Sequence, residues 1–364
     1  MHVIVSRPAL LEVLGAASSV AATRSTKDVL KCVRLTTKDS VLIVSATDLE
    51  VALRVEVQQV EIKRKGDMLI PADKLMSIVR ESTDETLTLE AEEQVCHIRG
   101  KDSHFEVYGQ DPREFPPTPS LDGTPDLEVE ATVLFDLISK TIFAVAKENT
   151  RYAINGILWA KQGKKLVLVS TDGRRLARAV GAAEGSGADS QMIVPAKTVH
   201  VLQRVLGHTA GKAAVRFSSN QVIVQADNYC ISSALVEGHF PQYEDVIPKD
   251  SDKKVELNTE EFMSAVRRAA LLTNEQSKGV RLKFDANQLT LSSRAPEQGE
   301  ATISMNVDYA EAAIEIGFNP LFLVDALKVA NSETVTLEMK ESNRPGIFRV
   351  EQSFLYVVMP VNLA

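Results

Sequence analysis

Two aspartates are the clearest candidates for acid–base chemistry, because each directly follows a threonine at the end of an apolar stretch. Asp48 follows residues 41–47, and Asp172 follows residues 166–171. A carboxylate there could act as a general base, and an enzyme would depend on Asp172 with the nearby Arg175. The simpler interpretation is that each aspartate accepts hydrogen bonds from backbone N–H groups and stabilises a turn. We favour the turn and keep the enzyme as a rival.

The six histidines form no pattern typical of a metal or catalytic site. None lies at metal-ligand spacing to a second histidine or cysteine, and His97 and His104 flank an expected hairpin turn at residues 100–102. We interpret both as surface residues. The sequence contains no HExxH, GxSxG, Walker lysine loop or GxGxxG pattern. It therefore predicts a protein that is not an enzyme and that uses no metal or cofactor.

The three cysteines Cys32, Cys96 and Cys230 are far apart and never form a CxxC pair. This argues against a disulfide framework and against a zinc site, and it favours small buried apolar side chains. The N-terminus lacks the pattern of a signal peptide, and no apolar run reaches about 18 residues. We therefore expect a cytoplasmic protein that makes no contact with membranes.

The formal net charge of −8 argues against a nucleic-acid-binding protein, which usually carries a basic excess. Net charge does not exclude nucleic-acid binding if basic side chains gather on one face and acidic side chains on another. Basic residues do recur in the helical segments, and these are Arg24, Lys74, Arg80, Lys197, Arg204, Arg267, Arg268 and Lys328. A mixed solvated face is the alternative, since Glu12, Asp136 and Asp325 share those segments.

The elements that carry these residues recur with a spacing of 124 residues. Thr47-Asp48 returns as Thr171-Asp172, and segment 69–75 returns as 193–199 and again at 317–323. Each of these segments is a short apolar strand, a proline or asparagine, and then a helix. Proline fits the first turn of a helix because its missing N–H would have no partner there. Repetition on this scale predicts an array of similar domains.

Each copy of the repeat combines helices with strands. Apolar residues recur at helical spacing, and these are Leu10, Leu14 and Ala17, then Leu134, Ile138, Ile142 and Val145, then Phe262, Val266, Ala269 and Ala270. Alternate residues from Leu49 to Val57, and from Ala301 to Val307, have the period of a sheet with one buried face. We predict an α+β fold of three copies, each with two helices packed on antiparallel sheet. The expected domains are residues 1–125, 126–252 and 253–364.

The last segment, Tyr356 to Val361, is apolar although chain ends usually lie at the surface. It is either a paired strand that closes the last sheet or part of a binding groove. The two interpretations are compatible, and we weigh them evenly.

Taken together, these residues resemble the beta subunit of bacterial DNA polymerase III, the sliding-clamp family. The resemblance runs over the whole length, and its order agrees with the triplication. Its most specific pieces are Thr47-Asp48-Leu49-Glu50, Arg151-Tyr152 with Asn155-Gly156, residues 171–176, 238–243, 279–282 and 316–319, and Tyr356-Val357-Val358-Met359-Pro360.

The resemblance implies a head-to-tail homodimer that forms a ring around double-stranded DNA, with helices inside and sheets outside. Only the lining would need to be basic, which reconciles the acidic net charge. The matching DNA-facing positions are Arg24, Lys74, Arg80, Asn149, Lys197 and Arg204, and the matching subunit-contact positions are Phe105, Val107, Leu271 and Leu272. Asp73 and Ala196 stand where the family often has further basic residues.

The resemblance also implies a groove that binds short peptides of the replicative polymerase alpha subunit, the clamp loader and other replication and repair proteins. Its matching positions are Arg151, Ile154, Thr171, Gly173, Arg174, Arg175, Leu176, Pro241, Val246, Asn319, Phe322, Val357, Met359, Pro360, Val361 and Leu363. The chain departs from the family at Arg174, at Asp245 and in its extra final residue, Ala364. We expect Met359→Ala with Leu176→Ala to weaken peptide binding without changing subunit assembly. A monomeric scaffold that uses only this groove is a further rival, and oligomeric state separates the two.

Overall fold

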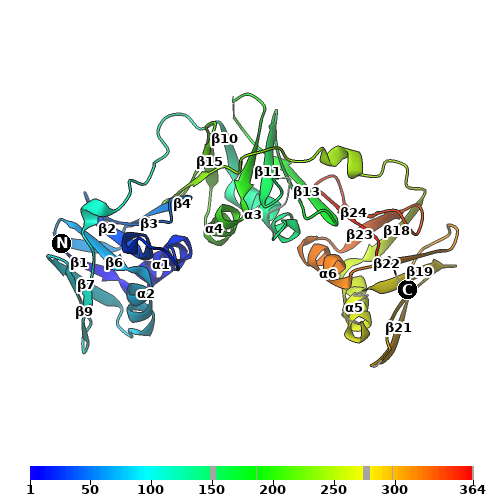
Figure 1. The fold of residues 1–364 in the computed structure, drawn as a ribbon, viewed down its shortest axis with the longest axis horizontal. Helices are drawn as coiled ribbons and strands as arrows, with labels where there is room; N and C mark the ends of the chain where they lie inside the picture. Colours follow the sequence, from blue (N-terminus) through cyan, green and yellow to red (C-terminus); the bar gives the residue numbers. More distant parts are fainter. Residues whose placement is uncertain (148–152, 186, 274–278, 297, 363–364) are drawn as a thin grey trace. The chain divides into compact units, whose positions relative to one another are not determined.

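Two compact units make up the chain in the computed structural model, which describes residues 1–147, 153–185, 187–273, 279–296 and 298–362 (Figure 1). The first unit takes its described residues from Met1–Phe135, Ala183–Ala188 and Lys197–Leu235. The second takes them from Asp136–Ala182, Asp189–Ala196 and Val236–Ala364. The middle third of the chain therefore contributes to both units.

One order of elements occurs three times along the chain: a strand, a helix, four strands, a helix and three strands, with one additional strand, β5, in the first copy. The first copy contains β1 (His2–Ser6), α1 (Arg7–Val20), β2 (Cys32–Lys38), β3 (Val41–Thr47), β4 (Val51–Val57), β5 (Val60–Arg64), β6 (Asp67–Pro71), α2 (Ala72–Glu81), β7 (Thr86–Glu92), β8 (Val95–Arg99) and β9 (His104–Tyr108). The second contains β10 (Leu127–Glu130), α3 (Ala131–Ser139), β11 (Gly156–Gln162), β12 (Lys165–Thr171), β13 (Arg175–Ala182), β14 (Ser190–Pro195), α4 (Ala196–Leu206), β15 (Lys212–Phe217), β16 (Gln221–Ala226) and β17 (Tyr229–Ala234). The third contains β18 (Lys253–Asn258), α5 (Thr259–Ala269), β19 (Val280–Asp285), β20 (Gln288–Ala295), β21 (Gly299–Asn306), β22 (Ile314–Phe318), α6 (Pro320–Val329), β23 (Thr334–Met339), β24 (Gly346–Val350) and β25 (Phe354–Val358).

Antiparallel pairing joins neighbouring copies into continuous sheets. The first unit holds the sheets β5-β1-β7-β8-β9 and β10-β15-β16-β17-β4-β3-β2-β6, in which Tyr229 of β17 pairs with Val55 of β4. The second unit holds β14-β11-β12-β13-β25-β24-β23-β18 and β21-β20-β19-β22, in which Arg175 of β13 pairs with Val358 of β25. Each eight-stranded sheet therefore contains strands of two copies, and the C-terminal strand β25 lies inside one of them, paired with β13 on one side and β24 on the other. This agrees with the paired-strand interpretation of the apolar tail.

Helices pack their apolar stripes on these sheets. The predicted helical residues Leu10, Leu14 and Ala17 are buried in α1, and Phe262, Val266 and Ala269 are buried in α5. Burying one of the leucine, valine or phenylalanine side chains contributes about 1.5–3 kcal/mol relative to leaving it in water. Among the described residues, no helix has the length and apolar content to cross a bilayer.

The predicted boundaries of several elements are wrong. The helix around Leu134 ends at Ser139, and Ile142 belongs to a separate 3₁₀ turn at Ile142–Ala144. The Thr141 hydroxyl explains the early end, because it donates to the Leu137 carbonyl oxygen at 2.8 Å. Ala270 likewise begins a 3₁₀ turn, Ala270–Leu272, beyond α5.

Two of the three repeated segments have their proline before the helix and not in its first turn, where we predicted it. Pro71 and Pro195 end strands β6 and β14, and only Pro320 lies in the first turn of its helix. The first N–H groups of a helix have no partner within the helix. A proline directly before the helix lacks one of these N–H groups, just as a proline in the first turn does.

A turn with the same hydrogen bonds follows β3 and β12 and explains the two aspartates. Asp48 Oδ1 accepts from the N–H groups of Glu50 and Val51, at 3.0 and 2.8 Å. Asp172 Oδ1 accepts from the N–H groups of residues 174 and 175, at 3.0 and 3.1 Å. The preceding threonine hydroxyls also bond the backbone of their turns. The turn-stabilising interpretation of both aspartates is therefore confirmed.

Leu49 was wrongly placed on the buried face of its strand. It has a φ of +81° in this turn, and its side chain is 59% exposed. Gly173 occupies the equivalent position with a φ of +84°. Glycine adopts this backbone conformation without steric cost, whereas a branched side chain is strained there.

Leu49→Gly is expected to raise the free energy of unfolding of the first unit by about 1 kcal/mol, because it relieves that strain and removes little buried surface. Chemical denaturation followed by circular dichroism measures the change. The reciprocal variant Gly173→Ala has open space around the added methyl group and should destabilise its own unit by a similar amount. A less stable Leu49→Gly protein would contradict the strain argument.

The three cysteines are buried thiols in the described structure, as predicted from the sequence. Burial raises the pKa of Cys32 to about 11 and that of Cys96 to about 12. At neutral pH both are protonated, and a protonated, buried thiol is a poor nucleophile. These residues therefore act as small apolar side chains.

Candidate functional site

An apolar cavity of about 230 Å³ opens on the second unit, at the start of β13 and the end of β25. Its lining is Ile154, Thr171, Gly173, Arg174, Arg175, Leu176, Pro241, Gln242, Tyr243, Val246, Val357 and Met359. We call this cavity the groove. Apolar walls with a few polar groups at the rim are typical of sites that take apolar side chains of a ligand.

The pairing of β13 with β25 brings together the lining residues that these two strands supply. Leu176 of β13 lies opposite Val357 of β25, and the Met359 N–H donates to the Arg174 carbonyl oxygen at 2.9 Å. Leu176 and Val357 are both 3% exposed and belong to the hydrophobic core beneath the groove. Met359 and Val246, by contrast, are 44% and 55% exposed. The groove therefore has a fixed floor and an accessible apolar rim.

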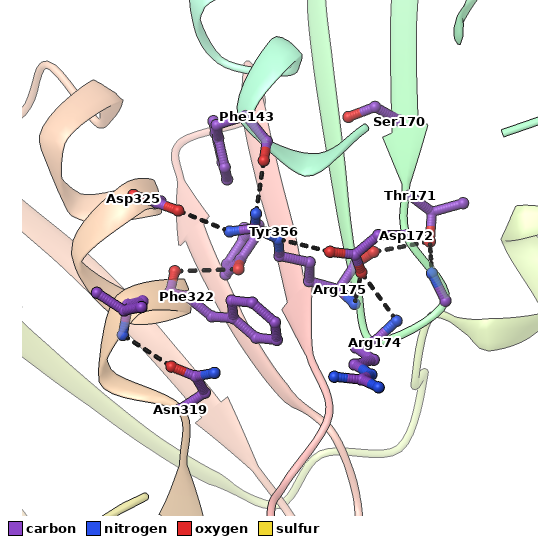
Figure 2. A network of polar contacts seen from close by, with 12 residues as sticks. Phe143, Ser170, Thr171, Asp172, Arg174, Arg175, Asn319, Phe322, Asp325 and Tyr356 are labelled. Carbon is purple, nitrogen blue, oxygen red and sulfur yellow. Dashed lines mark hydrogen bonds and ion pairs between the residues drawn. The ribbon is translucent and has the colours of Figure 1, made fainter. Parts of the chain in front are cut away.

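Arg175, a lining residue of the groove, contacts residues of the helix α6 (Figure 2). Its guanidinium donates to Asp172 at 3.0 Å, to Asp325 at 2.9 Å and to the Phe143 carbonyl oxygen at 2.6 Å. The same group stacks over the Phe322 ring at 4.3 Å from the centroid. Only 9% of the Arg175 side chain is exposed, so these contacts replace most of its hydration.

The electrostatics of this network keep Arg175 charged. Burial by itself would lower the pKa of the guanidinium, but the bond to Asp325, the neighbouring Tyr356 and Asp172 outweigh it and raise that pKa. Burial also raises the pKa of the Tyr356 phenol, whose hydroxyl donates to the Phe322 carbonyl oxygen at 3.0 Å. The hydrogen bonds and ion pairs of the network hold the charged Arg175 side chain in place, which fits a structural support.

Most of the residues predicted for the groove from the sequence line it. Asn319 and Phe322 are not among the lining residues. The Asn319 side chain caps α6 by accepting from the Leu321 N–H at 3.0 Å, and the Phe322 ring contacts the Arg175 guanidinium. Pro360 and Val361 line a neighbouring cavity of about 1150 Å³ instead. Arg151 and Leu363 lie outside the described residues.

Gln242 and Tyr243 line the groove but were not predicted as site residues. Both were within the sequence piece 238–243, so its continuity past Pro241 was the available signal. Asp245, noted as a departure, lies in the same 3₁₀ turn, Tyr243–Val246.

Five of the six predicted DNA-facing residues are exposed cations of the first unit. Lys74 and Arg80 lie on α2, Lys197 and Arg204 lie on α4, and Arg24 lies in the loop after α1. Lys74 pairs with Asp73 at 3.7 Å, and Lys197 pairs with Asp48. Arg80 and Arg204 line one cavity of about 330 Å³ together with Glu12 and His208. Asn149 lies outside the described residues.

The predicted subunit-contact residues lie on accessible elements of the two units. Phe105 and Val107 are on β9, the last strand of its sheet, and Phe105 is 40% exposed. Leu271 and Leu272 are in the 3₁₀ turn after α5, and Leu271 is 77% exposed. An exposed edge strand and exposed large apolar side chains are features of protein–protein contact surfaces.

Comparison with known proteins identifies the family of the chain. Three family profiles match successive segments: the DNA polymerase III beta subunit N-terminal domain at residues 1–119, its central domain at 128–242 and its C-terminal domain at 244–362. The chain belongs to the DNA polymerase III beta-subunit family.

Relatives in this family are beta sliding clamps over their full length. The protein of Pseudomonas putida is 34% identical over 367 residues, and that of Escherichia coli is 32% identical over 370 residues, with 100% of both chains covered in each case. The crystal structure of the Pseudomonas aeruginosa DNA polymerase III subunit beta matches with a TM-score of 0.91 at 32% identity. A Bartonella birtlesii sliding clamp bound to griselimycin matches with a TM-score of 0.91 at 30% identity, and both comparisons cover 100% of each chain.

Family membership decides between the functional classes considered from the sequence. The sliding clamps are non-catalytic processivity factors of DNA polymerase III, so the chain is a clamp of DNA replication and the enzyme rival is set aside. The three matched domains confirm the predicted α+β triplication. The domain limits 1–125, 126–252 and 253–364 stay a prediction, because the matched segments 1–119, 128–242 and 244–362 do not define them.

Proposed function

We propose that two copies of this sliding clamp associate head to tail into a ring that encircles double-stranded DNA in the cytoplasm. The ring holds DNA topologically, so contacts with phosphates are weak and independent of sequence. It holds the replicative polymerase alpha subunit, the clamp loader and other replication and repair proteins by short peptides in the groove.

The observation that carries the peptide part of this proposal is the groove, an apolar cavity with a fixed floor and an accessible rim. Its volume of about 230 Å³ suits one or two apolar side chains of an extended segment rather than a folded partner. The exposed residue Arg174 at the rim supplies a positive charge that orients the bound segment.

The ring part of the proposal is supported by the exposed apolar residues at the two accessible elements. Phe105 on β9 and Leu271 after α5 are two different surfaces, as a head-to-tail contact requires. The cations Lys74, Arg80 and Arg204 provide the electrostatic attraction for DNA. An acidic chain with these exposed cations can bind DNA without a basic net charge.

The oligomeric state tests the ring directly. Sedimentation equilibrium at micromolar concentration should give a mass of twice 39.8 kDa, and Phe105→Asp with Leu271→Asp should give 39.8 kDa, because buried charges oppose the contact. Leu321→Asp, a change at another exposed leucine, should leave the dimer intact. A monomeric wild-type chain would leave only the peptide-binding scaffold.

Retention on DNA then separates encircling from simple attraction. Clamps loaded on nicked circular DNA should remain bound at a salt concentration that abolishes phosphate contacts, and should be released when the circle is cut. Loss of the clamp from intact circles at that salt concentration would contradict a topological hold.

A further inference from the structure

The β8–β9 hairpin brings together three side chains that could bind a metal ion, although their spacing in the sequence gave no such signal. His97 Nδ1 lies 3.2 Å from His104 Nε2 and 3.6 Å from Glu106 Oε1. The three ligand atoms all lie within 4.8 Å of one another. The sequence indicates two surface histidines, and only the structure shows that their rings meet, with centroids 5.3 Å apart.

Strand register explains why these residues converge. His97 pairs directly with Glu106 across the hairpin, and His104 is the diagonal neighbour on the same face. Phe105 and Val107 alternate with His104 and Glu106, so their side chains point to the other face of β9. The cluster therefore lies on the sheet face opposite to the predicted subunit-contact residues.

The surroundings leave the three ligands available to an ion. Arg99, the cation directly opposite His104, is engaged with Glu90 at 2.7 Å. On the far side of the His97 ring, Glu92 lies 3.9 Å from Nε2. Histidines that bind a metal commonly have a carboxylate at the other ring nitrogen, which fixes the tautomer and orients the ring.

We propose that His97, His104 and Glu106 form a site for one divalent transition metal of the Zn²⁺ type. Two nitrogen ligands with bonds of about 2.0–2.1 Å and tetrahedral angles stand roughly 3.3 Å apart, which matches the two ring nitrogens here. Two imidazoles and one carboxylate favour Zn²⁺ over Mg²⁺ or Ca²⁺, which prefer oxygen ligands. A water molecule completes the coordination, because the site has three protein ligands and both His104 and Glu106 are exposed.

The site is tested on the untagged full-length chain after removal of metals with a chelator. Titration with Zn²⁺ in a calorimeter should give one ion per chain, and Co²⁺ should give the visible absorption bands of a tetrahedral site. His104→Gln should abolish the Co²⁺ bands. Glu106→Gln should weaken binding at least about tenfold. Loss of a residue that only supports a ligand already costs about that much, and Glu106 is proposed to bind the ion directly.

Matched controls keep the outcome clear. His208→Gln and His239→Gln change exposed histidines on other elements and should bind Zn²⁺ like the wild type. His104 is exposed, so its replacement leaves the fold intact and circular dichroism verifies this. The proposal is overturned if the wild type binds no Zn²⁺ at millimolar concentration, or if His104→Gln binds it as tightly as the wild type.

Discussion

Arg175→Met is expected to lower the free energy of unfolding of the second unit by about 3 kcal/mol. Methionine can fill the space beside Phe322, but it leaves Asp172, Asp325 and the Phe143 carbonyl oxygen without their donor. Removing one partner of a buried ion pair costs about 3–5 kcal/mol. We expect the lower end, since Asp172 keeps its two backbone bonds and the Asp325 side chain is 34% exposed.

Chemical denaturation followed by tryptophan fluorescence measures this effect in the correct unit, because the single tryptophan, Trp159, is buried in β11. Arg281→Met is the matched control: Arg281 pairs with Glu315 at the surface, and exposed pairs contribute less than about 1 kcal/mol. Adding Asp325→Leu to Arg175→Met should restore part of the stability, since it removes an unpaired carboxylate. An equal loss of unfolding free energy in Arg175→Met and Arg281→Met would show that the buried network stabilises the unit no more than an exposed ion pair does.

Val246→Ala with Met359→Ala is expected to weaken the binding of a polymerase-derived peptide by roughly 30- to 150-fold, which is about 2–3 kcal/mol. Both side chains are exposed at the groove rim in the free protein, so a bound apolar side chain would bury them. Fluorescence anisotropy with a labelled peptide from the replicative polymerase alpha subunit gives the Kd.

The structure favours this pair over the Leu176→Ala change that the sequence suggested. Leu176 is 3% exposed and packs in the core beneath the groove, so its truncation costs about 2–5 kcal/mol of stability and confuses binding with folding. Leu49→Ala removes an equally exposed apolar side chain outside the groove and should leave the Kd unchanged. An unchanged Kd in the rim double variant would remove the groove from the proposed mechanism.

Local rules decided the parts of the molecule that the sequence predicted correctly. The Thr-Asp turns depend on bonds between residues two to four apart, so the same pair of residues produces the same turn after β3 and after β12. The structure shows a further local contact of this kind at α5, where the Asn258 side chain accepts from the N–H groups of Glu260 and Glu261 at 3.1 and 3.0 Å. Repetition of these local signals was enough to predict three copies of one α+β domain.

Element ends were less predictable because the spacing of apolar residues does not show where a helix or a strand stops. The apolar spacing continued past Ser139, yet the helix stops there. The Thr141 hydroxyl donates to the Leu137 carbonyl oxygen, and the Thr141 carbonyl oxygen accepts from the Ser170 hydroxyl of β12. Leu49 continued the alternation of its strand but lies in the left-handed turn. The apolar pattern therefore predicted a helix that was about one turn too long and a strand that was one residue too long.

The sequence by itself determined the repeated elements, the buried thiols and, through its resemblance, the family. Only the tertiary structure decided which distant side chains meet. Arg175 contacts Asp325 across 150 residues, and Val357 lies beside Leu176 because β25 pairs with β13. His97 and His104 meet through the register of a hairpin. Such contacts depend on strand pairing and register, which the burial of whole faces selects, and no single stretch of sequence contains that information.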